Sequence, residues 1–174
     1  MILAMKVRRV RKPCSSWLLF LGKTVEKRKD FFDRHAFSWD EDLGGEDRIH
    51  KAEEVVRWFG LTPNQSVLDV GTGTGILLPF IREGIGTKGR LIAIDFSYKM
   101  LRKAKIHESA GEKFLINASV EWIPLGSDQF DRVTCFSAFP HFPKKKRALL
   151  EMIRVLKSKG RLFIAHLHSI EEIK

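Results

Sequence analysis

The chain has 174 residues, which is the usual length of a single domain and is enough to bury a hydrophobic core. Its composition is 44% apolar and 30% charged, and no apolar stretch reaches the roughly 20 residues that cross a bilayer, so the disordered and membrane-spanning classes are excluded. The two cysteines, Cys14 and Cys135, form no disulfide or metal-ligand pattern, which favours a reducing, cytoplasmic location.

The formal net charge of +10 is concentrated near the N-terminus. Residues 1–29 contain nine Lys and Arg and one acidic residue, whereas residues 30–174 contain 22 basic and 20 acidic residues. We therefore expect a basic, poorly ordered extension over residues 1–29 and a single domain over residues 30–174. The apolar patch from Trp17 to Leu21 is too short for a secretory signal, which leaves an anionic membrane surface or RNA as alternative contacts of the extension.

The body of the chain begins with helical patterns and then alternates between strand and helix patterns. Residues 31–45 predict a short helical turn and a loop, and residues 47–60 carry apolar side chains at helical spacing, which predicts an amphipathic helix. Short apolar runs predict five strands, at 66–71, 90–95, 113–117, 130–137 and 160–167. The segments between them predict helices over about 75–83, 97–107 and 144–156, the last with Leu149, Met152, Ile153 and Leu156 on one face.

This alternation of strands and helices predicts a fold. Right-handed crossovers between such strands give a parallel sheet that is covered on both faces by helices. The expected fold is therefore α/β, a doubly wound, Rossmann-like sheet. Ligands bind such sheets outside the carboxyl ends of the strands, so the loops after the first, second and fourth strands are expected to hold the chemistry.

Three glycines follow the first predicted strand. In VLDVGTGTGILLPF, which begins at Val67, Gly71, Gly73 and Gly75 stand two residues apart just before a helix. Without Cβ atoms, they let a ligand lie directly against backbone N–H groups at a helix start. Asp95 closes the second strand, where a carboxylate can accept hydrogen bonds from both hydroxyls of a ribose. A cofactor that contains a nucleoside is implied.

Two common nucleotide-binding motifs do not fit this turn. The dinucleotide fingerprint asks for glycine or alanine at position 76, where this chain has Ile76, and the P-loop asks for a Gly-Lys-Ser/Thr sequence that is absent. Asp69, which precedes the turn, suits a cationic amino group rather than a phosphate, by charge complementarity.

Four segments in this order resemble the motifs of the class I S-adenosylmethionine-dependent methyltransferases. DVGTGTG resembles their first motif, and IDFSYKMLRKA (94–104) resembles their second. VEWIPLGSDQFDRV (120–133) is similar to their adenine-edge segment and fourth strand, and RVLKSKGRLFIA (154–165) is similar to the helix and fifth strand that close the core. The resemblance runs from about Phe31 to the C-terminus and implies S-adenosyl-L-methionine as the cofactor.

The resemblance implies a role for each residue at a matching position. Asp69 and the backbone of the turn would hold the methionyl end of the cofactor, and Asp95 would hold the ribose. Phe96 and Met100 would contact the faces of the adenine. Where the family usually has an aspartate for the adenine amino group, this chain has Ser119, which bonds more weakly than a carboxylate. The full cofactor-binding set is Asp69, Gly71, Thr72, Gly73, Gly75, Asp95, Phe96, Met100, Ser119 and Val120.

The segment FFDRHAFSWDE, from Phe31, is similar to the N-terminal segment of the small-molecule branch that includes the ubiquinone and menaquinone C-methyltransferases. This resemblance implies a small-molecule methyl acceptor. It also implies a lid over the cofactor, formed by Phe32, Trp39 and Phe37, with Phe136 on the acceptor side.

The segment CFSAFPHF (135–142) follows the fourth strand, where the family positions its acceptors. It lacks the Asn/Asp-Pro-Pro-Tyr/Phe signature of amino-group methylation on nucleic acid bases, so nucleic acid is not the expected partner. His141 is the candidate catalytic residue, as a base or as a group that orients the acceptor, because the ordinary pKa of histidine is near neutral.

Two features leave alternatives open. His166 and His168 share one face of the fifth strand and could meet His141, so a three-histidine metal site is an alternative to the metal-free site that we expect. The class I resemblance also implies two further strands after the fifth, which this chain lacks. The fifth strand would then have an open edge that could pair with another chain.

These observations favour a cytoplasmic methyltransferase that uses S-adenosyl-L-methionine and acts on a small molecule. Two alternatives remain. One is a cofactor-binding module without catalysis, favoured by Ser119 and by the missing strands. The other is an RNA methyltransferase guided by the basic extension.

Overall fold

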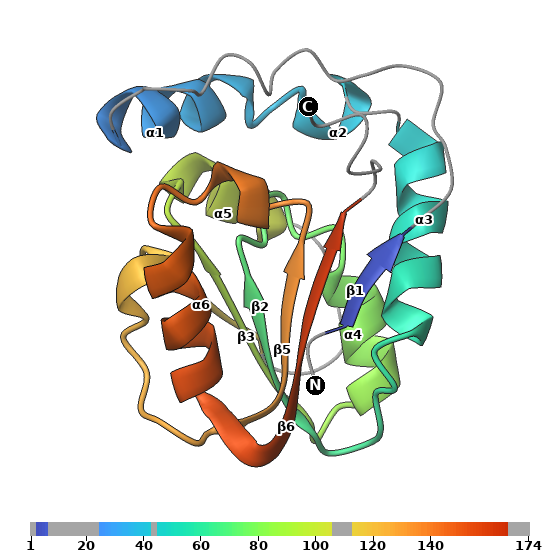
Figure 1. The fold of residues 1–174 in the computed structure, drawn as a ribbon. Helices are drawn as coiled ribbons and strands as arrows, with labels where there is room; N and C mark the ends of the chain where they lie inside the picture. Colours follow the sequence, from blue (N-terminus) through green and yellow to red (C-terminus); the bar gives the residue numbers. More distant parts are fainter. Residues whose placement is uncertain (1–2, 7–24, 43–44, 106–112, 167–174) are drawn as a thin grey trace.

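The computed structural model describes residues 3–6, 25–42, 45–105 and 113–166. They form a sheet of six parallel strands in the order β1-β6-β5-β2-β3-β4 (Figure 1). The strands are β1 (Leu3–Lys6), β2 (Ser66–Val70), β3 (Arg90–Asp95), β4 (Lys113–Asn117), β5 (Phe130–Phe136) and β6 (Leu156–His166). The five strands predicted from the sequence are all present, and the doubly wound α/β fold is confirmed.

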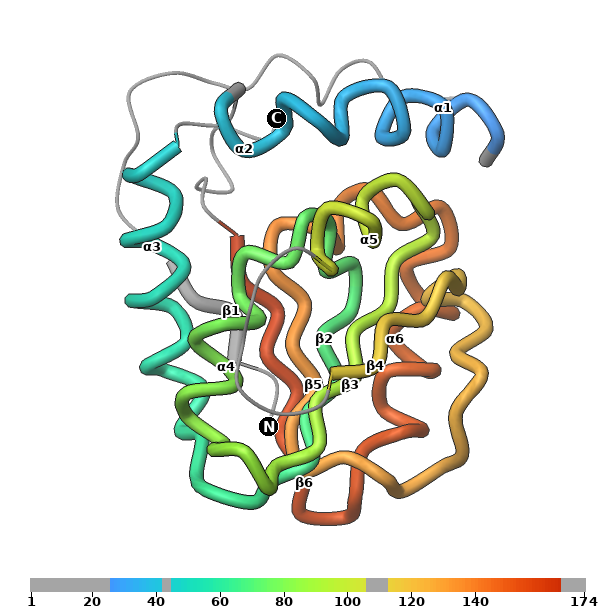
Figure 2. Tube along the Cα trace, turned by 180° about the vertical axis from the view of Figure 1, so that it is seen from behind, coloured from blue at the N-terminus to red at the C-terminus, as the bar shows by residue number. Residues whose placement is uncertain are grey.

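Helices cover both faces of the sheet. They are α1 (Val25–His35), α2 (Trp39–Asp42), α3 (Gly45–Arg57), α4 (Leu78–Ile85), α5 (Tyr98–Ala104) and α6 (Lys145–Arg154), with short 3-10 turns at η2 (Val120–Trp122) and η3 (Phe139–His141). Seen from behind in Figure 2, α3 and α4 lie to one side of the strands and α6 to the other. Among the described residues, no helix is long and apolar enough to cross a membrane.

Two hydrophobic clusters fill the space between the sheet and its helices. Val67 packs in the cluster that includes Ala52 of α3 and Ile81 of α4. Its neighbour Leu68 packs in the cluster on the opposite face, with Met152 of α6. Successive strand residues point to opposite faces, so a central strand buried on both sides has a continuous apolar run instead of alternation.

The order of the strands places the site. From β2 the chain winds through β3 and β4 in one direction and through β5 and β6 in the other, so the winding reverses between β2 and β5. The ribbon and the tube view both show α1 and α2 lying across the carboxyl ends of the strands (Figures 1 and 2). The reversal point is therefore open toward these two helices.

The edge of β6 differs from the expectation. Leu3–Lys6 pair with Phe163–His166 in parallel register, so the edge that we expected to be open is covered there. A strand of only four residues carries too little periodicity to be recognised in the sequence. Residues 25–29 of the predicted extension are helical, because α1 begins at Val25. The rest of that extension lies outside the described residues.

The face of α6 that packs against the sheet also differs from the face expected from the sequence. We expected Ile153 in the core, but it is 46% exposed, whereas Ala148, Met152 and Val155 are buried. Glu151 takes an inward position because its carboxylate accepts a hydrogen bond from the N–H of Ile123, at 3.1 Å. A polar group that serves a buried backbone donor has thus shifted the face that apolar spacing alone indicated.

Candidate functional site

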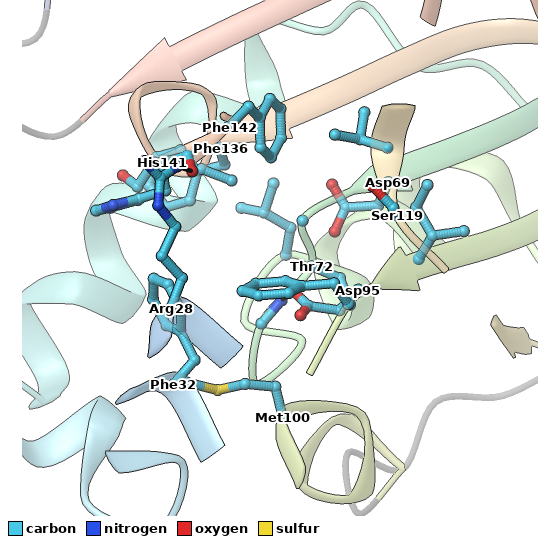
Figure 3. A pocket seen from close by; sticks show the side chains of 18 of the residues that line it. Arg28, Phe32, Asp69, Thr72, Asp95, Met100, Ser119, Phe136, His141 and Phe142 are labelled. Atoms are coloured by element: carbon cyan, nitrogen blue, oxygen red, sulfur yellow. Dashed lines mark hydrogen bonds between the residues drawn. The ribbon is translucent and has the colours of Figure 1, made fainter. Parts of the chain in front are cut away.

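A single pocket at the carboxyl ends of β2, β3 and β5 contains most of the predicted site residues (Figure 3). The turn after β2 and the loops after β3 and β5 form its walls, and α1 contributes Arg28 and Phe32. The predicted residues that line it are Asp69, Gly71, Thr72, Gly73, Asp95, Phe96, Met100, Ser119, Val120, Phe32, Trp39, Phe136 and His141. Gly75 does not line the pocket.

The three positions of the turn require glycine for different structural reasons. All three have positive φ angles, which favour glycine. A Cβ on Gly71 would lie 2.5 Å from the Cβ of Ala138, and one on Gly75 would lie 2.9 Å from the Cβ of Ala104. A Cβ on Gly73 would meet nothing within 4 Å. Gly71 and Gly75 therefore permit close packing, whereas Gly73 leaves its backbone open to the pocket.

Asp95 joins the turn to the loop after β3. Its carboxylate accepts hydrogen bonds from the N–H of Gly73, at 2.9 Å, and from the N–H of Ser97, at 2.8 Å. Burial raises the pKa of Asp95 to about 6, although these two N–H groups oppose the change. The negative charges of Asp69 and Asp33 raise the pKa of Asp95 further. Two backbone donors thus hold a desolvated carboxyl group at the pocket.

Asp69 is the second buried carboxyl group of the pocket. Its Oδ1 accepts a hydrogen bond from the hydroxyl of Thr134, at 2.7 Å. Burial raises the pKa of Asp69 to about 6, and the hydroxyls of Thr134 and Thr72 oppose this change. No cation pairs with Asp69 among the described residues, so a positively charged ligand group would be favoured beside it.

Apolar side chains line the pocket near the loop after β3. Met100 is fully buried, and Phe96 is half-buried where the loop after β3 leads into α5. Ser119 lies exposed at the pocket, and its Oγ accepts a hydrogen bond from the N–H of Glu121, at 3.3 Å. Its hydroxyl proton remains available for a ligand acceptor. Val120 lines the same wall.

Aromatic side chains from α1 and α2 line the pocket, among them Phe32 and Trp39, the two residues of the predicted lid. The ring of Phe32 lies 5.3 Å from that of Trp39, 5.5 Å from that of Phe96 and 5.4 Å from that of His141, all centroid to centroid. Phe37 does not take part, because it is 65% exposed and lies outside the pocket. Phe32 of α1 and Ala36, in the turn just after it, are buried, whereas the next residue points to solvent.

His141 lies in η3, at the acceptor side of the pocket. Burial lowers the pKa of His141 to about 4, and the positive charges of Arg28 and Lys145 add to this effect. Its imidazole is therefore neutral at neutral pH and is a weak base. Phe136 and Phe142 line the same part of the pocket and make it apolar.

Sequence analysis missed two arginines that line the pocket, Arg28 and Arg48. Arg28 was assigned to the basic extension. Arg48 is only 7% exposed, and its Nη1 donates to Asp40, at 3.0 Å. Asp40 also accepts a hydrogen bond from Thr74 of the turn, at 2.6 Å. Arg48 lies four residues before Ala52 on the buried face of α3, and a charged residue at core spacing was the available signal.

A metal centre finds no support in the described part of the chain. His141 and His166 both line the pocket, but His168 lies outside the described residues. No group of three or more His, Cys, Asp and Glu side chains that could hold a metal ion occurs among the residues that were placed.

The fold and the pocket define a class of protein. Residues 68–164, more than half of the chain, match the family model "Methyltransferase domain". The chain therefore belongs to the methyltransferase-domain family, and it is a class I S-adenosylmethionine-dependent methyltransferase by fold and by family. The cofactor of this family is S-adenosyl-L-methionine.

The chain is also similar to individual curated enzymes of this family. The chain is 36% identical over 125 residues to a ubiquinone/menaquinone biosynthesis C-methyltransferase from Vibrio vulnificus (strain YJ016), covering 70% of this chain and 48% of the relative. It is 34% identical over 106 residues to the enzyme of the same name from Wigglesworthia glossinidia brevipalpis, covering 59% and 42%. The chain thus spans about half the length of these curated relatives.

Two solved structures show the same fold. A methyltransferase in complex with the Haloferax volcanii methyltransferase activator Trm112 is 28% identical, with a TM-score of 0.67 and coverage of 76% of this chain and 58% of that one. An S-adenosylmethionine-dependent methyltransferase from Aquifex aeolicus is 29% identical, with a TM-score of 0.61 and coverage of 69% and 66%.

Proposed function

We propose that this protein transfers a methyl group from S-adenosyl-L-methionine to a small molecule. One observation carries the proposal: two buried carboxyl groups, Asp69 and Asp95, line the same pocket as an open glycine turn at the point where the sheet winding reverses. When bound, the cofactor supplies a methyl group on a positively charged sulfur. Negative charge nearby favours such a ligand, most strongly where water is excluded.

The chain's own groups fit this cofactor. Each carboxylate oxygen of Asp95 accepts one backbone hydrogen bond and keeps lone pairs for the two hydroxyls of a ribose. Phe96 and Met100 provide an apolar surface for a base, and Ser119 provides a hydroxyl at its edge. Gly73 lets the ligand approach the main chain.

Arg48 would bind the carboxylate of the cofactor. Its Nε is buried and has no hydrogen-bond partner among the described residues, and the side chain lines the pocket. Leaving a buried N–H of a charged group unpaired is unfavourable, so a carboxylate there satisfies it. Asp40 connects Arg48 to Thr74, which places this cation beside the glycine turn.

The chemical step would need few protein groups. Methyl transfer from a sulfonium proceeds largely by alignment of the nucleophile with carbon and sulfur. His141 is neutral near pH 7 and its lowered pKa makes it a weak base, so its role would be to orient the acceptor by hydrogen bonding. The aromatic side chains of Phe32, Trp39 and Phe142 would exclude water from this end of the pocket.

The relatives suggest the kind of acceptor. The names of the Vibrio and Wigglesworthia enzymes specify C-methylation in ubiquinone and menaquinone biosynthesis. We propose methylation at carbon of a small molecule as the finer function of this chain. The largely aromatic acceptor side of the pocket supports this assignment.

The test combines a binding and a transfer measurement. Isothermal titration with S-adenosylhomocysteine should show binding by the wild type and a large loss of affinity in Asp95→Ala. Asp47→Ala is the matched control, because Asp47 is an exposed aspartate in the first turn of α3. A labelled-methyl assay on cell extract then reports transfer. No binding by the wild type would refute the cofactor assignment.

Binding without transfer would favour the second candidate, a cofactor-binding module without catalysis. Ser119, in place of the usual carboxylate, is the observation that favours it. The Haloferax methyltransferase forms a complex with an activator, so we propose repeating the transfer assay with such an activator protein before accepting this alternative. Transfer that appears only in the mixture would restore the enzyme assignment.

A further inference from the structure

The outer face of α6 combines a lysine with exposed apolar side chains. The side of this helix that faces the sheet buries Ala148 and Met152. Residues four and seven positions apart lie on one face of a helix, so Lys146, Leu150 and Ile153 share the opposite, outward face. Leu150 is 52% exposed and Ile153 is 46% exposed. These two apolar side chains therefore stay largely outside the core.

Trp122 of η2 extends this surface. The views in Figures 1 and 2 show η2 and α6 on the side of the sheet opposite α3 and α4, and the two elements are in contact. Trp122 is 69% exposed, and the guanidinium carbon of Arg147 lies 4.3 Å from the centroid of its ring. Arg147 is itself anchored, because its Nε donates to the backbone carbonyl of Glu121, at 3.2 Å. A large aromatic side chain is thus held at the surface beside α6.

A run of cations begins the same helix. Residues 144–147 read Lys-Lys-Lys-Arg, and all three lysines are exposed. None of the three pairs with a carboxylate among the described residues, although Lys145 donates to the backbone carbonyl of Phe142, at 3.3 Å. The first turn of α6 contains no acidic residue, and cations at this positive end of the helix dipole are unfavourable for the helix itself. An external anion would offset this repulsion.

The acidic residues near this surface do not neutralise the lysines. Glu121 and Glu151 are buried, and Glu151 pairs with Arg154, at 2.8 Å. Asp128 is exposed, but its N–H donates to the backbone carbonyl of Arg154, which places it at the C-terminal end of α6. The lysines at the N-terminal end therefore meet no exposed carboxylate from α6 or η2.

Basic surfaces bind both lipid headgroups and RNA, and the apolar residues distinguish these two partners. Anionic headgroups attract lysines, while Trp, Leu and Ile side chains gain from entering the boundary between headgroups and acyl chains. Aliphatic side chains such as Leu150 and Ile153 offer RNA neither a stacking surface nor a hydrogen bond. Lys146, one turn before Leu150, can lay its stem along the apolar surface and keep its charged end at the headgroups. The combination favours a lipid surface.

We propose that α6 and η2 dock the protein on membranes that contain anionic phospholipids. In this arrangement the lysines bind headgroups, and the apolar side chains enter the interface without crossing the bilayer. The inference concerns the outer surface of the chain and does not depend on the proposed function. Phe142 and Pro143 line the pocket and directly precede the lysines, so docking also brings the loop after β5 to the lipid. The residues of this membrane-docking surface are Trp122, Lys144, Lys145, Lys146, Leu150 and Ile153.

Co-sedimentation of the full chain with lipid vesicles tests the proposal. Vesicles of phosphatidylcholine alone are compared with vesicles that also contain phosphatidylglycerol. The wild type should bind the anionic vesicles at least about tenfold more tightly, and added salt should weaken this binding. Each lysine near an anionic surface is worth about fivefold in the partition coefficient, so Lys144→Gln/Lys146→Gln should lower it about 25-fold. Lys88→Gln/Lys159→Gln is the matched control, because it removes the same charge from exposed lysines near the amino ends of β3 and β6.

Apolar variants test insertion. Leu150→Gln and Ile153→Gln keep the charge, and each should weaken binding to anionic vesicles about three- to tenfold by removing apolar surface from the interface. Ile49→Gln, a matched change at a 48% exposed position of α3, should bind as the wild type does. The tryptophan emission of the wild type should shift to the blue on anionic vesicles, and Trp122→Phe should reduce that shift. All the changed side chains are exposed, and circular dichroism checks that each variant folds.

Three results would overturn the proposal. Equal binding of the wild type to neutral and anionic vesicles would exclude a charged lipid as the partner. Equal binding of Lys144→Gln/Lys146→Gln and its control would assign the interaction to another basic segment. Full binding by both Leu150→Gln and Ile153→Gln would leave charge as the only contribution. Anisotropy titration of a labelled oligouridylate would then assign the surface to RNA if the lysine variant alone loses affinity.

Discussion

Asp69 is an ionisable residue that is fully buried, and its burial makes the stability of the fold depend on pH. Burial raises its pKa to about 6 in the folded protein, whereas an aspartate in an unfolded chain titrates near 3.9. Between these values the folded state binds more protons than the unfolded state, so stability falls as pH rises through this window. The ligand-free protein therefore carries, at the expense of stability, the carboxylate that we propose as a cofactor-binding group.

Replacing Asp69 with asparagine should raise stability at neutral pH. The amide oxygen of asparagine can still accept the hydrogen bond of Thr134, and no charge is buried. Above about pH 6 the variant should be more stable than the wild type by as much as about 3 kcal/mol, and the difference should vanish below about pH 4. Urea unfolding at several pH values measures this, and titration with S-adenosylhomocysteine should show weakened binding. An equal difference at both ends of the pH range would contradict the ionisation argument.

The glycines of the turn should differ in their tolerance of alanine. Gly71→Ala and Gly73→Ala both place a side chain at positive φ, which costs about 1–2 kcal/mol. Gly71→Ala should lose more, because its Cβ would lie 2.5 Å from Ala138. Thermal unfolding should rank Gly71→Ala below Gly73→Ala, while Gly73→Ala lowers S-adenosylhomocysteine affinity through a methyl group in the pocket. The reverse ranking of stability would show that the turn does not depend on this packing.

At the scale of elements, one hydrogen bond links α1 to the loop after β3. Asp33 of α1 accepts a hydrogen bond from the hydroxyl of Ser97, at 2.5 Å. The same hydroxyl accepts from the N–H of Met100 as the N-cap of α5, and the N–H of Ser97 donates to Asp95. The position of α1 over the pocket is thus coupled to the loop that presents Asp95.

Asp33→Ala should loosen α1 and leave α5 intact. The lost bond and ion pair predict a stability decrease of about 1–2 kcal/mol and faster hydrogen exchange of α1 amides. Ser97→Ala should also accelerate exchange in α5, since it removes the cap as well. Asp30→Ala is the control on α1, because Asp30 is exposed. Unchanged exchange in α1 of Asp33→Ala would mean that apolar packing alone holds the lid.

The elements also show what the sequence can and cannot predict. Asp95 closes β3 and Asp69 lies one residue before the end of β2, and the parallel topology brings these strand ends together at the pocket. Phe32 and Trp39 followed from the family resemblance, and both line the pocket. Arg28 was missed because α1 begins within a segment that appeared only as a basic run. The position of Arg28 in the pocket depends on how α1 crosses the sheet, and no local sequence pattern encodes that crossing.

At the scale of the whole molecule, the sheet has two edges with different protection. β4 forms one edge, and β1 covers the other by pairing with Phe163–His166 of β6. Unpaired backbone groups along a strand invite pairing with another chain. We propose that β1 prevents self-association through β6.

Deleting residues 1–24 removes β1 but not α1, and it should increase concentration-dependent association relative to the full chain in sedimentation velocity. The deletion also removes six basic residues, and a lower net charge favours association by itself. Met5→Pro separates the two causes, because it keeps the charge but places a residue without a backbone N–H within β1, where Met5 is in register with Ala165 of β6. Association of both variants assigns the effect to the open edge of β6. Association of the deletion variant alone assigns it to charge, and monomers in both cases would show that the edge of β6 does not recruit a second chain.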